Sequence, residues 1–460
     1  MLGQEVMDMI NRELGGLYGA DFLRDLRENS GLYDIYEGEN REGQEFYGQL
    51  DYEPTRKRTN FIRKLIKEQA RFLFGKTPEV TLYSSDTAAA EELRRYVNGT
   101  LKRNLFSERL IKAARDCFVG KRVALVVGCE DGEDVCFSFR PSLGFVYDYE
   151  GGDPDRVVKA VFVHAENDAP DRREQRIYRQ KFEMADGRCL VSEGIYDGHG
   201  GPVDIRRERE DTGLDFMPVK IIRNDGQTGD HKGESDVAPL VELQRIYNCL
   251  TSDDVDALRF NMFPQTVAMN IDEDSLKHIR IAPAALIDAH AEPSGGDGEQ
   301  ARIYKLESGF NYDSRIENAL NRIKGEMHEL LSIPMVTTAE LTGFMASGKA
   351  MRAVYWQMVT RCEEKFTTWR PALEWLCMTI LKVAEVCGKL SVRIPEDLVI
   401  RVENVYPLMD DEYEEKDSDM KAVACGVMSR KRYIRKWDVG LGEEGAEKEL
   451  QQIADERRSL

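Results

Sequence analysis

The chain has 460 residues, of which 42% are hydrophobic, 9% aromatic and 32% charged, so it can bury a large core and is neither disordered nor a membrane protein. The length corresponds to about three domains. The formal net charge is −19, from 64 Lys and Arg against 83 Asp and Glu. This balance excludes a protein that grips nucleic acid over its whole surface, because phosphate binding requires a positive field. A protein that handles DNA without holding it is still compatible with the composition.

Neither a targeting signal nor a membrane span is expected. The first eight residues predict an acidic amphipathic helix, whereas a signal peptide has a basic and then an apolar region. The most apolar helical stretch, 375–387, contains Lys382 and Glu385 and is too short to cross a bilayer. The nine cysteines form no Cys-x-x-Cys motif, and no His lies near Cys129 and Cys136, so we expect free thiols, no metal site and a cytoplasmic setting.

The first 120 residues are predicted to be mainly helical. Residues 60–74 carry apolar side chains on one side and predict a helix that ends at Gly75, with Pro78 just beyond. A second helical run is predicted from Ala88 to Val119, with a break near Asn98-Gly99.

From residue 122 the pattern changes to that of strands separated by Gly, Asp and Pro turns. Asp-Gly steps at 131–132, 186–187 and 197–198 predict hairpins. The charge-dense stretches 171–176 and 206–211 are interpreted as solvated hairpin edges. The predicted strands are 122–127, 135–139, 145–147, 157–163, 176–182 and 218–223.

Helical spacing returns at Ser235, after a Gly- and Asp-rich connection over 224–234. A second helix is predicted from Asp313 to Leu331, and the two helices flank a small α/β unit over 263–310 that includes a strand at Thr266–Met269. Together with the strands, these helices predict an α+β fold.

The last third is expected to begin with a stretch of small and hydroxylated residues from Pro334 to Gly348. The longest helix is predicted to follow, from Lys349 to about Cys387, with a kink at Pro371 because proline removes a backbone hydrogen bond and clashes with the preceding turn. Beyond it we expect a strand over 398–405, a helix that begins after the N-cap Ser429, and a final charged helix over 443–458.

One segment matches the start of a nucleotide-binding motif. Gly343–Lys349 fits the first seven positions of the phosphate-binding loop G-x-x-x-x-G-K-[ST]. The eighth position is Ala350, which has no hydroxyl for Mg²⁺, and no apolar strand precedes Gly343. We therefore interpret the segment as a loop that leads into a helix, and keep a nucleotide hydrolase as an alternative function.

No other arrangement predicts catalysis, a metal or a cofactor, so we expect the protein not to be an enzyme. The six histidines are scattered, and the acidic run 410–415 lacks the spacing of a calcium loop and is interpreted as a solvated face. A basic cluster is compatible both with phosphate contact and with the solvated face of an amphipathic helix. It comprises Arg430, Lys431, Arg432, Arg435 and Lys436.

Several local motifs, in their order and spacing, resemble the portal proteins of tailed bacteriophages, in particular the SPP1-type portal family. The matching pieces extend from about Asn60 to Asp455, and the connection 224–234 departs from the family pattern by being long and Gly-rich. The pieces are Asn60–Ile66 with Phe72–Pro78, Pro218–Asn224 with Ser235-Asp236 and Leu243–Asn248, and Ser347–Met351.

The resemblance implies a portal fold. Residues 1–234 would form the wing, 235–262 and 311–333 the stem helices, and 263–310 the clip. Residues 334–348 would be the tunnel loop, 349–407 the long wing helix with a returning strand, and 408–460 the helical crown.

It also implies a function at one capsid vertex of the virion, after assembly in the cytoplasm of the bacterial host. Members form a closed homo-oligomeric ring of about twelve subunits. Double-stranded DNA is packaged through the channel by terminase and later ejected. The implied partners are the terminase large subunit, a head-completion adaptor, and capsid and scaffolding proteins, with no membrane.

The composition of 334–348 fits a channel through which DNA must slide. The segment contains no Lys or Arg before Lys349, and Glu340 is its single charge. Because each phosphate contact adds a binding term that retards sliding, a nearly uncharged collar favours passage. The predicted channel residues are Met335, Val336, Thr337, Thr338, Ala339, Glu340, Leu341, Thr342, Gly343, Phe344, Met345, Ala346, Ser347 and Lys349. A helical capsid scaffold or adaptor is the other alternative.

Overall fold

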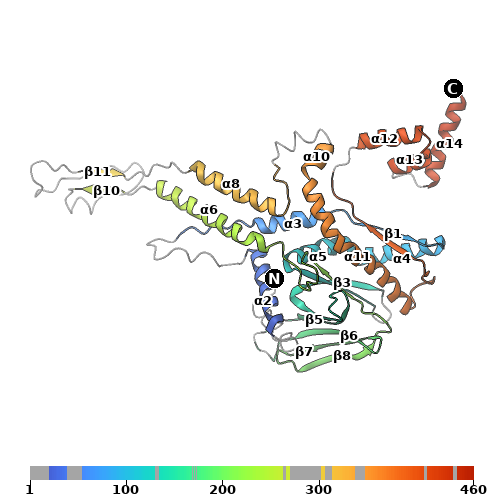
Figure 1. Cartoon of the computed structure of the whole chain (residues 1–460), viewed down its shortest axis with the longest axis horizontal. Coiled ribbons are helices and arrows are strands. Elements are labelled where there is room, and N and C mark those ends of the chain that lie inside the picture. The colour runs from blue at the N-terminus through green and yellow to red at the C-terminus, as the bar shows by residue number, and fades with distance from the viewer. Residues whose placement is uncertain are drawn as a thin grey trace, which may run out of the picture.

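The computed structural model describes residues 20–38, 54–129, 134–167, 169, 171, 173–262, 266–269, 302–305, 313–336, 348–408, 412–438 and 443–459. Over these residues the chain is mixed α+β with several antiparallel sheets, as the sequence predicted. A body of helices and sheets carries a helical arm on one side and a group of three helices on another (Figure 1).

Four helices open the described part of the body. They are α2 (Ala20–Glu37), α3 (Phe61–Phe74), α4 (Thr87–Arg103) and α5 (Phe106–Gly120). Helix α3 has the predicted limits, because the Asn60 side chain accepts a hydrogen bond from the Arg63 amide at 2.8 Å and the helix stops at Gly75.

The predicted break at Asn98-Gly99 is wrong, since both residues lie inside α4. The chain turns at Asn104 and Leu105, where Leu105 adopts a left-handed φ of 53°. The buried Asn104 amide donates to the carbonyls of Thr100 (2.9 Å) and Val135 (3.2 Å), which caps α4 and ties it to the sheet. The hydrogen bond from Asn104 to Val135 decides where α4 ends. Gly99 does not end the helix, because one glycine inside a helix lowers its stability by only about 1 kcal/mol.

The described part of the body contains three antiparallel sheets. A three-stranded sheet has the order β3 (Cys136–Pro141), β2 (Arg122–Gly128), β9 (Val219–Arg223). A five-stranded meander runs through β4 (Phe145–Tyr149), β5 (Val157–Ala165), β6 (Ile177–Ala185), β7 (Arg188–Tyr196) and β8 (Pro202–Asp211). The third sheet pairs β1 (Glu79–Tyr83) with β12 (Val399–Glu403), which ties the N-terminal half to the C-terminal half.

The predicted hairpins at 186–187 and 197–198 are confirmed. Asp186 and Gly187 have positive φ angles of 50° and 74° and connect β6 to β7. Asp197 opens the turn that connects β7 to β8. Strand β8 is an exposed edge rich in charge, as expected for 206–211. The step at 131–132 lies outside the described residues.

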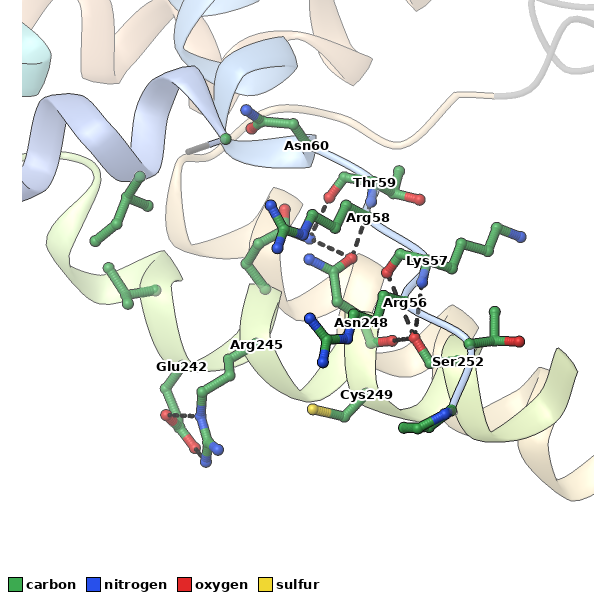
Figure 2. Close-up of a pocket in the computed structure, with 16 residues that line it drawn as sticks. Arg56, Lys57, Arg58, Thr59, Asn60, Glu242, Arg245, Asn248, Cys249 and Ser252 are labelled. Carbon is green, nitrogen blue, oxygen red and sulfur yellow. Dashed lines mark hydrogen bonds and ion pairs between the residues drawn. The ribbon is translucent and has the colours of Figure 1, made fainter. Parts of the chain in front are cut away.

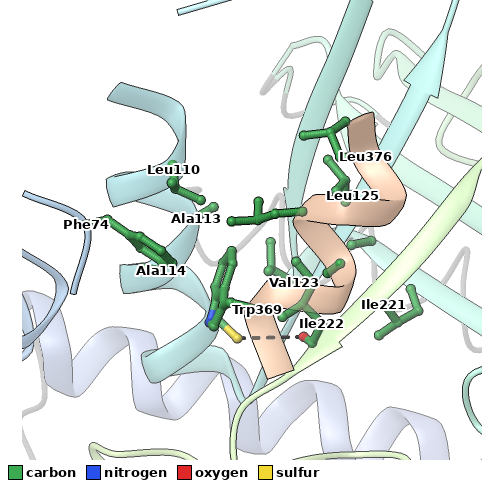
Figure 3. Packing of buried hydrophobic residues seen from close by; sticks show 14 of the residues in the cluster. Phe74, Leu110, Ala113, Ala114, Val123, Leu125, Ile221, Ile222, Trp369 and Leu376 are labelled. Carbon is green, nitrogen blue, oxygen red and sulfur yellow. Dashed lines mark hydrogen bonds between the residues drawn. The ribbon is translucent and has the colours of Figure 1, made fainter. Parts of the chain in front are cut away.

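Trp369 lies at the centre of the main core (Figure 3). Its side chain is 1% exposed, and its ring meets that of Phe74 at 5.1 Å in an edge-on geometry. Helix α11 (Trp356–Val386) and helix α5 both pack on the three-stranded sheet, around Val123 and Leu125 of β2. The core therefore joins three segments that are far apart in the sequence.

The long helix predicted from Lys349 is interrupted. A short helix, α10 (Gly348–Val354), is followed by a turn at Tyr355 and then by α11. The Tyr355 ring stacks on Phe72 of α3 at 5.8 Å, so a tertiary contact holds the turn. Helix α11 continues through Pro371, and the kink expected there stays a prediction.

The arm consists of α6 (Val241–Met262), which follows a short 3-10 turn, η2 (Ala238–Leu240), and α8 (Asp313–Leu330). An antiparallel pair, β10 (Thr266–Met269) and β11 (Arg302–Lys305), lies beyond their far ends (Figure 1). The predicted strand at 266–269 is thus confirmed, and the rest of the predicted unit 263–310 lies outside the described residues.

Three helices end the chain: α12 (Glu412–Ala424), α13 (Arg430–Trp437) and α14 (Glu443–Ser459). The predicted N-cap is confirmed, because the Ser429 hydroxyl accepts from the Arg432 amide at 3.2 Å. The helix predicted at residues 1–8 lies outside the described part. None of the described helices has the length and apolar content needed to cross a membrane.

Candidate functional site

The arm is anchored where its two helices enter the main core. Met327 and Leu331, at the end of α8, are almost completely buried, as is Leu240 just before α6. The Phe61 ring of α3 meets the Tyr247 ring of α6 edge-on at 4.9 Å, and the Lys324 ammonium of α8 lies over the Phe61 ring at 5.7 Å. The arm root is therefore fixed on α3, while its far end extends away from the body (Figure 1).

An extended strap, residues 54–60, lies along α6 (Figure 2). None of the strands that the structure describes pairs with the strap. Its alternate backbone amides donate instead to side chains on one face of α6. The bonds are Thr55 to Asp256 (2.9 Å), Lys57 to Ser252 (3.0 Å), Thr59 to Asn248 (3.0 Å) and, at the start of α3, Phe61 to Gln244 (2.8 Å).

This ladder depends on a match between two periodicities. The four acceptors are spaced four residues apart on α6, which corresponds to about 6 Å along a helix. Every second residue of an extended chain is about 6.6 Å further on. The two spacings agree over three steps, so one helix face satisfies four amides that would otherwise need a neighbouring strand.

A buried charge cluster joins the arm root to α11. Lys365 of α11 is 4% exposed, and its ammonium donates to Asn224 (2.7 Å), Asp225 (3.0 Å) and Asp236 (3.0 Å to the nearer oxygen). Asp236, which precedes η2, is also 4% exposed.

Asp236 has further partners, since it accepts from Gln69 of α3 at 3.0 Å and from Arg361 of α11 at 3.1 Å. Its own amide donates to the Phe118 carbonyl of α5 at 2.9 Å. One carboxylate thus connects the arm root with α3, α5 and α11.

The Gly-rich connection 224–234 positions this cluster. Gly233 has a φ of 75°, and a Cβ there would lie 2.5 Å from the Lys121 carbonyl oxygen, so only glycine fits. The loop closes through bonds from the Asn224 amide to the Lys121 carbonyl (2.8 Å) and from the Glu234 amide to the Asn224 carbonyl (2.7 Å). Asn224 and Asp225, at the start of this connection, lie at the Lys365 ammonium.

The predicted tunnel loop is described only at its ends. Met335, which is exposed, and Val336 follow α8, and Lys349 belongs to α10, whereas 337–347, with Glu340, Phe344 and most of the Gly343–Lys349 motif, lie outside the described residues. The start of the loop is held by His328, whose Nδ1 lies 3.3 Å from the Ile333 carbonyl. Desolvation lowers the pKa of this buried histidine, which favours its neutral form.

The basic cluster of α13 is a solvent-exposed surface with no buried residue. Two of its cations have acidic partners: Lys436 lies 2.7 Å from Asp419 of α12, and Lys431 lies 2.5 Å from Glu447 of α14. The Lys436 side chain and the Trp437 ring nitrogen share the Asp419 carboxylate. Arg432 and Arg435 border a common hollow with Lys431 and Lys436. Part of the cluster therefore holds the three terminal helices together.

Within the described ranges, no group of three or more His, Cys, Asp or Glu side chains is arranged to hold a metal ion. Cys129, Cys136 and Cys387 border the same cavity. Burial, together with a hydrogen bond to Cys387, raises the pKa of the Cys129 thiol to about 12, so this group is not a reactive thiolate at neutral pH.

The sequence reasoning missed the ladder and the buried cluster. The ladder left a trace, because polar residues recur every four positions at 244, 248, 252 and 256 of α6. Lys365 left none, since a lysine between Cys362 and Phe366 gives no sign that its partners lie more than 120 residues earlier.

Comparison with known proteins agrees with this architecture. No curated protein matches the chain. The family model described as phage portal protein, SPP1 Gp6-like, matches residues 18–459, which is nearly the whole chain. Portal proteins are non-catalytic structural proteins, so the nucleotide-hydrolase alternative is rejected, and a plain scaffold or adaptor role gives way to a portal role. The chain therefore belongs to the SPP1 Gp6-like phage portal protein family, whose members form an oligomeric ring at the capsid vertex and serve in DNA packaging and head–tail joining.

Proposed function

We propose that the parts of this portal protein divide as follows. The arm helices α6 and α8 are the stem, and the β10–β11 pair belongs to the clip. The body formed by residues up to 234 with α10, α11 and β12 is the wing, 334–348 is the tunnel loop, and the terminal helices α12–α14 are the crown. The observation that carries this division is the arm itself, two helices rooted in one core with a small β unit at their far end (Figure 1).

The proposed ring contains about twelve copies, as closed rotational symmetry permits. The clip contacts the terminase large subunit during packaging and a head-completion adaptor afterwards, while capsid and scaffolding proteins surround the ring. DNA passes through the channel next to 334–348. A net charge of −19 on each copy supports passage over adsorption, because it repels the duplex from the wall.

The test is deletion of 337–347. The deletion variant is expected to assemble closed rings, seen by negative-stain microscopy, and to lose DNA packaging, measured as nuclease-protected genome in filled heads. Lys102→Ala, at an exposed position of α4 outside the segment, is the control, and it is expected to package normally. Normal packaging by the deletion variant would refute the role of this segment. A clean monomer for the unaltered protein would contradict the ring.

We also infer that the crown cluster touches DNA through the cations that do not hold the crown together. Lys431 and Lys436 are engaged by Glu447 and Asp419, and Arg430 and Arg432 are exposed at the start of α13. Arg430→Gln with Arg432→Gln is expected to lower the amount of DNA retained per head and to leave the rings intact. Retention unchanged from that of the unaltered protein would exclude the contact.

A further inference from the structure

Residues 54–78 form the most basic part of a strongly acidic chain. They contain eight Lys or Arg residues and one acid, Glu68, which gives a charge of +7 and leaves −26 on the remaining residues. The segment comprises the strap on α6 and the whole of α3, so it lies where the arm joins the body (Figure 1). Its cations are Arg56, Lys57, Arg58, Arg63, Lys64, Lys67, Arg71 and Lys76.

Three of these cations form a row along α3. Arg63, Lys67 and Arg71 are four residues apart and therefore lie on the same helix face, about 6 Å from one to the next. Helix α5 packs on α3 and adds Arg115. Partial desolvation, followed by the charges of Arg63, Arg115 and Arg71, lowers the pKa of Lys67, and the charge of Glu37 acts in the opposite direction. The Lys67 ammonium is therefore close enough to the other three cations to be repelled by them. We call these four residues the basic row.

Few acidic side chains of the same subunit neutralise the basic row. Arg63 pairs with Glu37 at 2.9 Å. Within the part of the chain that the structure describes, Lys67, Arg71 and Arg115 make no ion pair. The Nε atoms of Arg63 and Arg115 are buried and have no hydrogen-bond acceptor. A carboxylate-bearing partner at the exposed ends of these side chains would relieve the repulsion.

A ring built from one kind of subunit needs two different complementary faces on each copy, because its interface is heterologous. This chain has few basic surfaces and many acidic residues that could face them. DNA is another possible partner of the basic row, because it is also strongly negative. Tight contacts with its phosphates, however, would retard a duplex that has to slide through the channel. An unneutralised row of cations therefore fits a lasting contact with protein better than a passing contact with DNA.

We propose that the basic row, Arg63, Lys67 and Arg71 of α3 with Arg115 of α5, docks on carboxylates of the adjacent copy in the ring. The inference rests on the proposed ring and names the surface that closes it. The contact sets the salt dependence of assembly, because charge pairs at a partly exposed interface are screened by ions.

The first experiment reverses two charges, Lys67→Glu with Arg71→Glu. The matched control is Arg95→Glu with Lys102→Glu on α4, which changes the net charge by the same amount at exposed positions and also alters the last turn of a helix. Ring and monomer fractions are measured by mass photometry over a range of protein and NaCl concentrations. The α3 variant is expected to need at least about tenfold more protein to form rings, with a weaker response to salt, while the control assembles normally.

The outcomes separate this inference from the proposed function. If the unaltered protein forms no rings, the proposed ring fails. If the unaltered protein forms rings and the α3 variant assembles like the control, the basic row is not the interface and the inference is overturned. Circular dichroism checks folding, and if the reversal disturbs it, Lys67→Gln with Arg71→Gln replaces it under the same criteria.

The second experiment identifies the partner in the unaltered protein. Rings assembled from mixed ¹⁴N- and ¹⁵N-labelled subunits are treated with a carbodiimide, which joins a lysine amine directly to a carboxylate. Mass spectrometry is expected to find Lys67 coupled to Asp or Glu of the other isotope. Coupling only within one subunit, for example to Glu37, would overturn the proposal. The proposal would also be overturned if duplex DNA protected Lys67 from acetylation and ring assembly did not. That result would assign the basic row to DNA binding.

Discussion

Removal of the Lys365 ammonium should loosen the junction between the arm and α11. Lys365→Met keeps the length and the apolar part of the side chain but removes the charge that contacts Asn224, Asp225 and Asp236 at 2.7–3.0 Å. Because Asp236 is buried, its carboxylate would lose its nearest opposite charge and could not turn to water.

The expected loss is about 3 kcal/mol in the free energy of unfolding. Breaking a buried ion pair on one side costs about 3–5 kcal/mol. The lower end applies here, since Arg361 and Gln69 still donate to Asp236 at 3.1 and 3.0 Å. Asp236→Asn combined with Lys365→Met removes both charges, so the double variant should lose about 1–3 kcal/mol less than the sum of the single variants.

The assay is urea unfolding followed by fluorescence of the four tryptophans, which include the buried Trp369 one turn from Lys365 on the same helix. Glu385→Gln, at an exposed position of α11, is the control and should change the free energy of unfolding by less than about 0.5 kcal/mol. A cost for Lys365→Met of the same size as for this control would refute the reasoning, because it would mean that Asp236 does not depend on the lysine.

Three further outcomes are expected. Burial raises the pKa of Asp116 to about 6 from an ordinary value of 3.8, so the folded state binds this proton more tightly than the unfolded state does. The free energy of unfolding should therefore fall by roughly 3 kcal/mol as the pH rises from about 4 to about 6. Asp116→Asn should remove this pH dependence of the free energy of unfolding, and an unchanged pH dependence would contradict the assignment. Asn248→Ala removes the acceptor of the Thr59 amide at a cost of about 1 kcal/mol, so hydrogen exchange at that amide should be about fivefold faster, whereas Asp253→Ala, outside the ladder, should not alter it. Trp369→Ala should cost about 3–5 kcal/mol in thermal unfolding, because it opens a cavity in the main core; a cost under about 1 kcal/mol would show that the site collapses freely.

Local pattern was sufficient for most elements of this fold. Asn60 and Gly75 mark the ends of α3, and Ser429 marks the start of α13, because capping involves only neighbouring residues. The Asp-Gly steps mark two hairpins, because a tight turn needs residues that tolerate positive φ. The failures occurred where a distant partner decided the outcome, as at Leu105 and Tyr355.

The sequence by itself determined the α+β class, the acidic balance, the order of the elements and the family, since these depend on composition, periodicity and short motifs. The tertiary structure alone decided that Lys365 meets Asp236, that the strap 54–60 is held by α6, and that Arg115 joins a row of cations on α3. These contacts join residues from about 40 to 200 positions apart. No local pattern encodes such pairs, because the polar groups find one another only after the apolar core has folded and excluded water from around them.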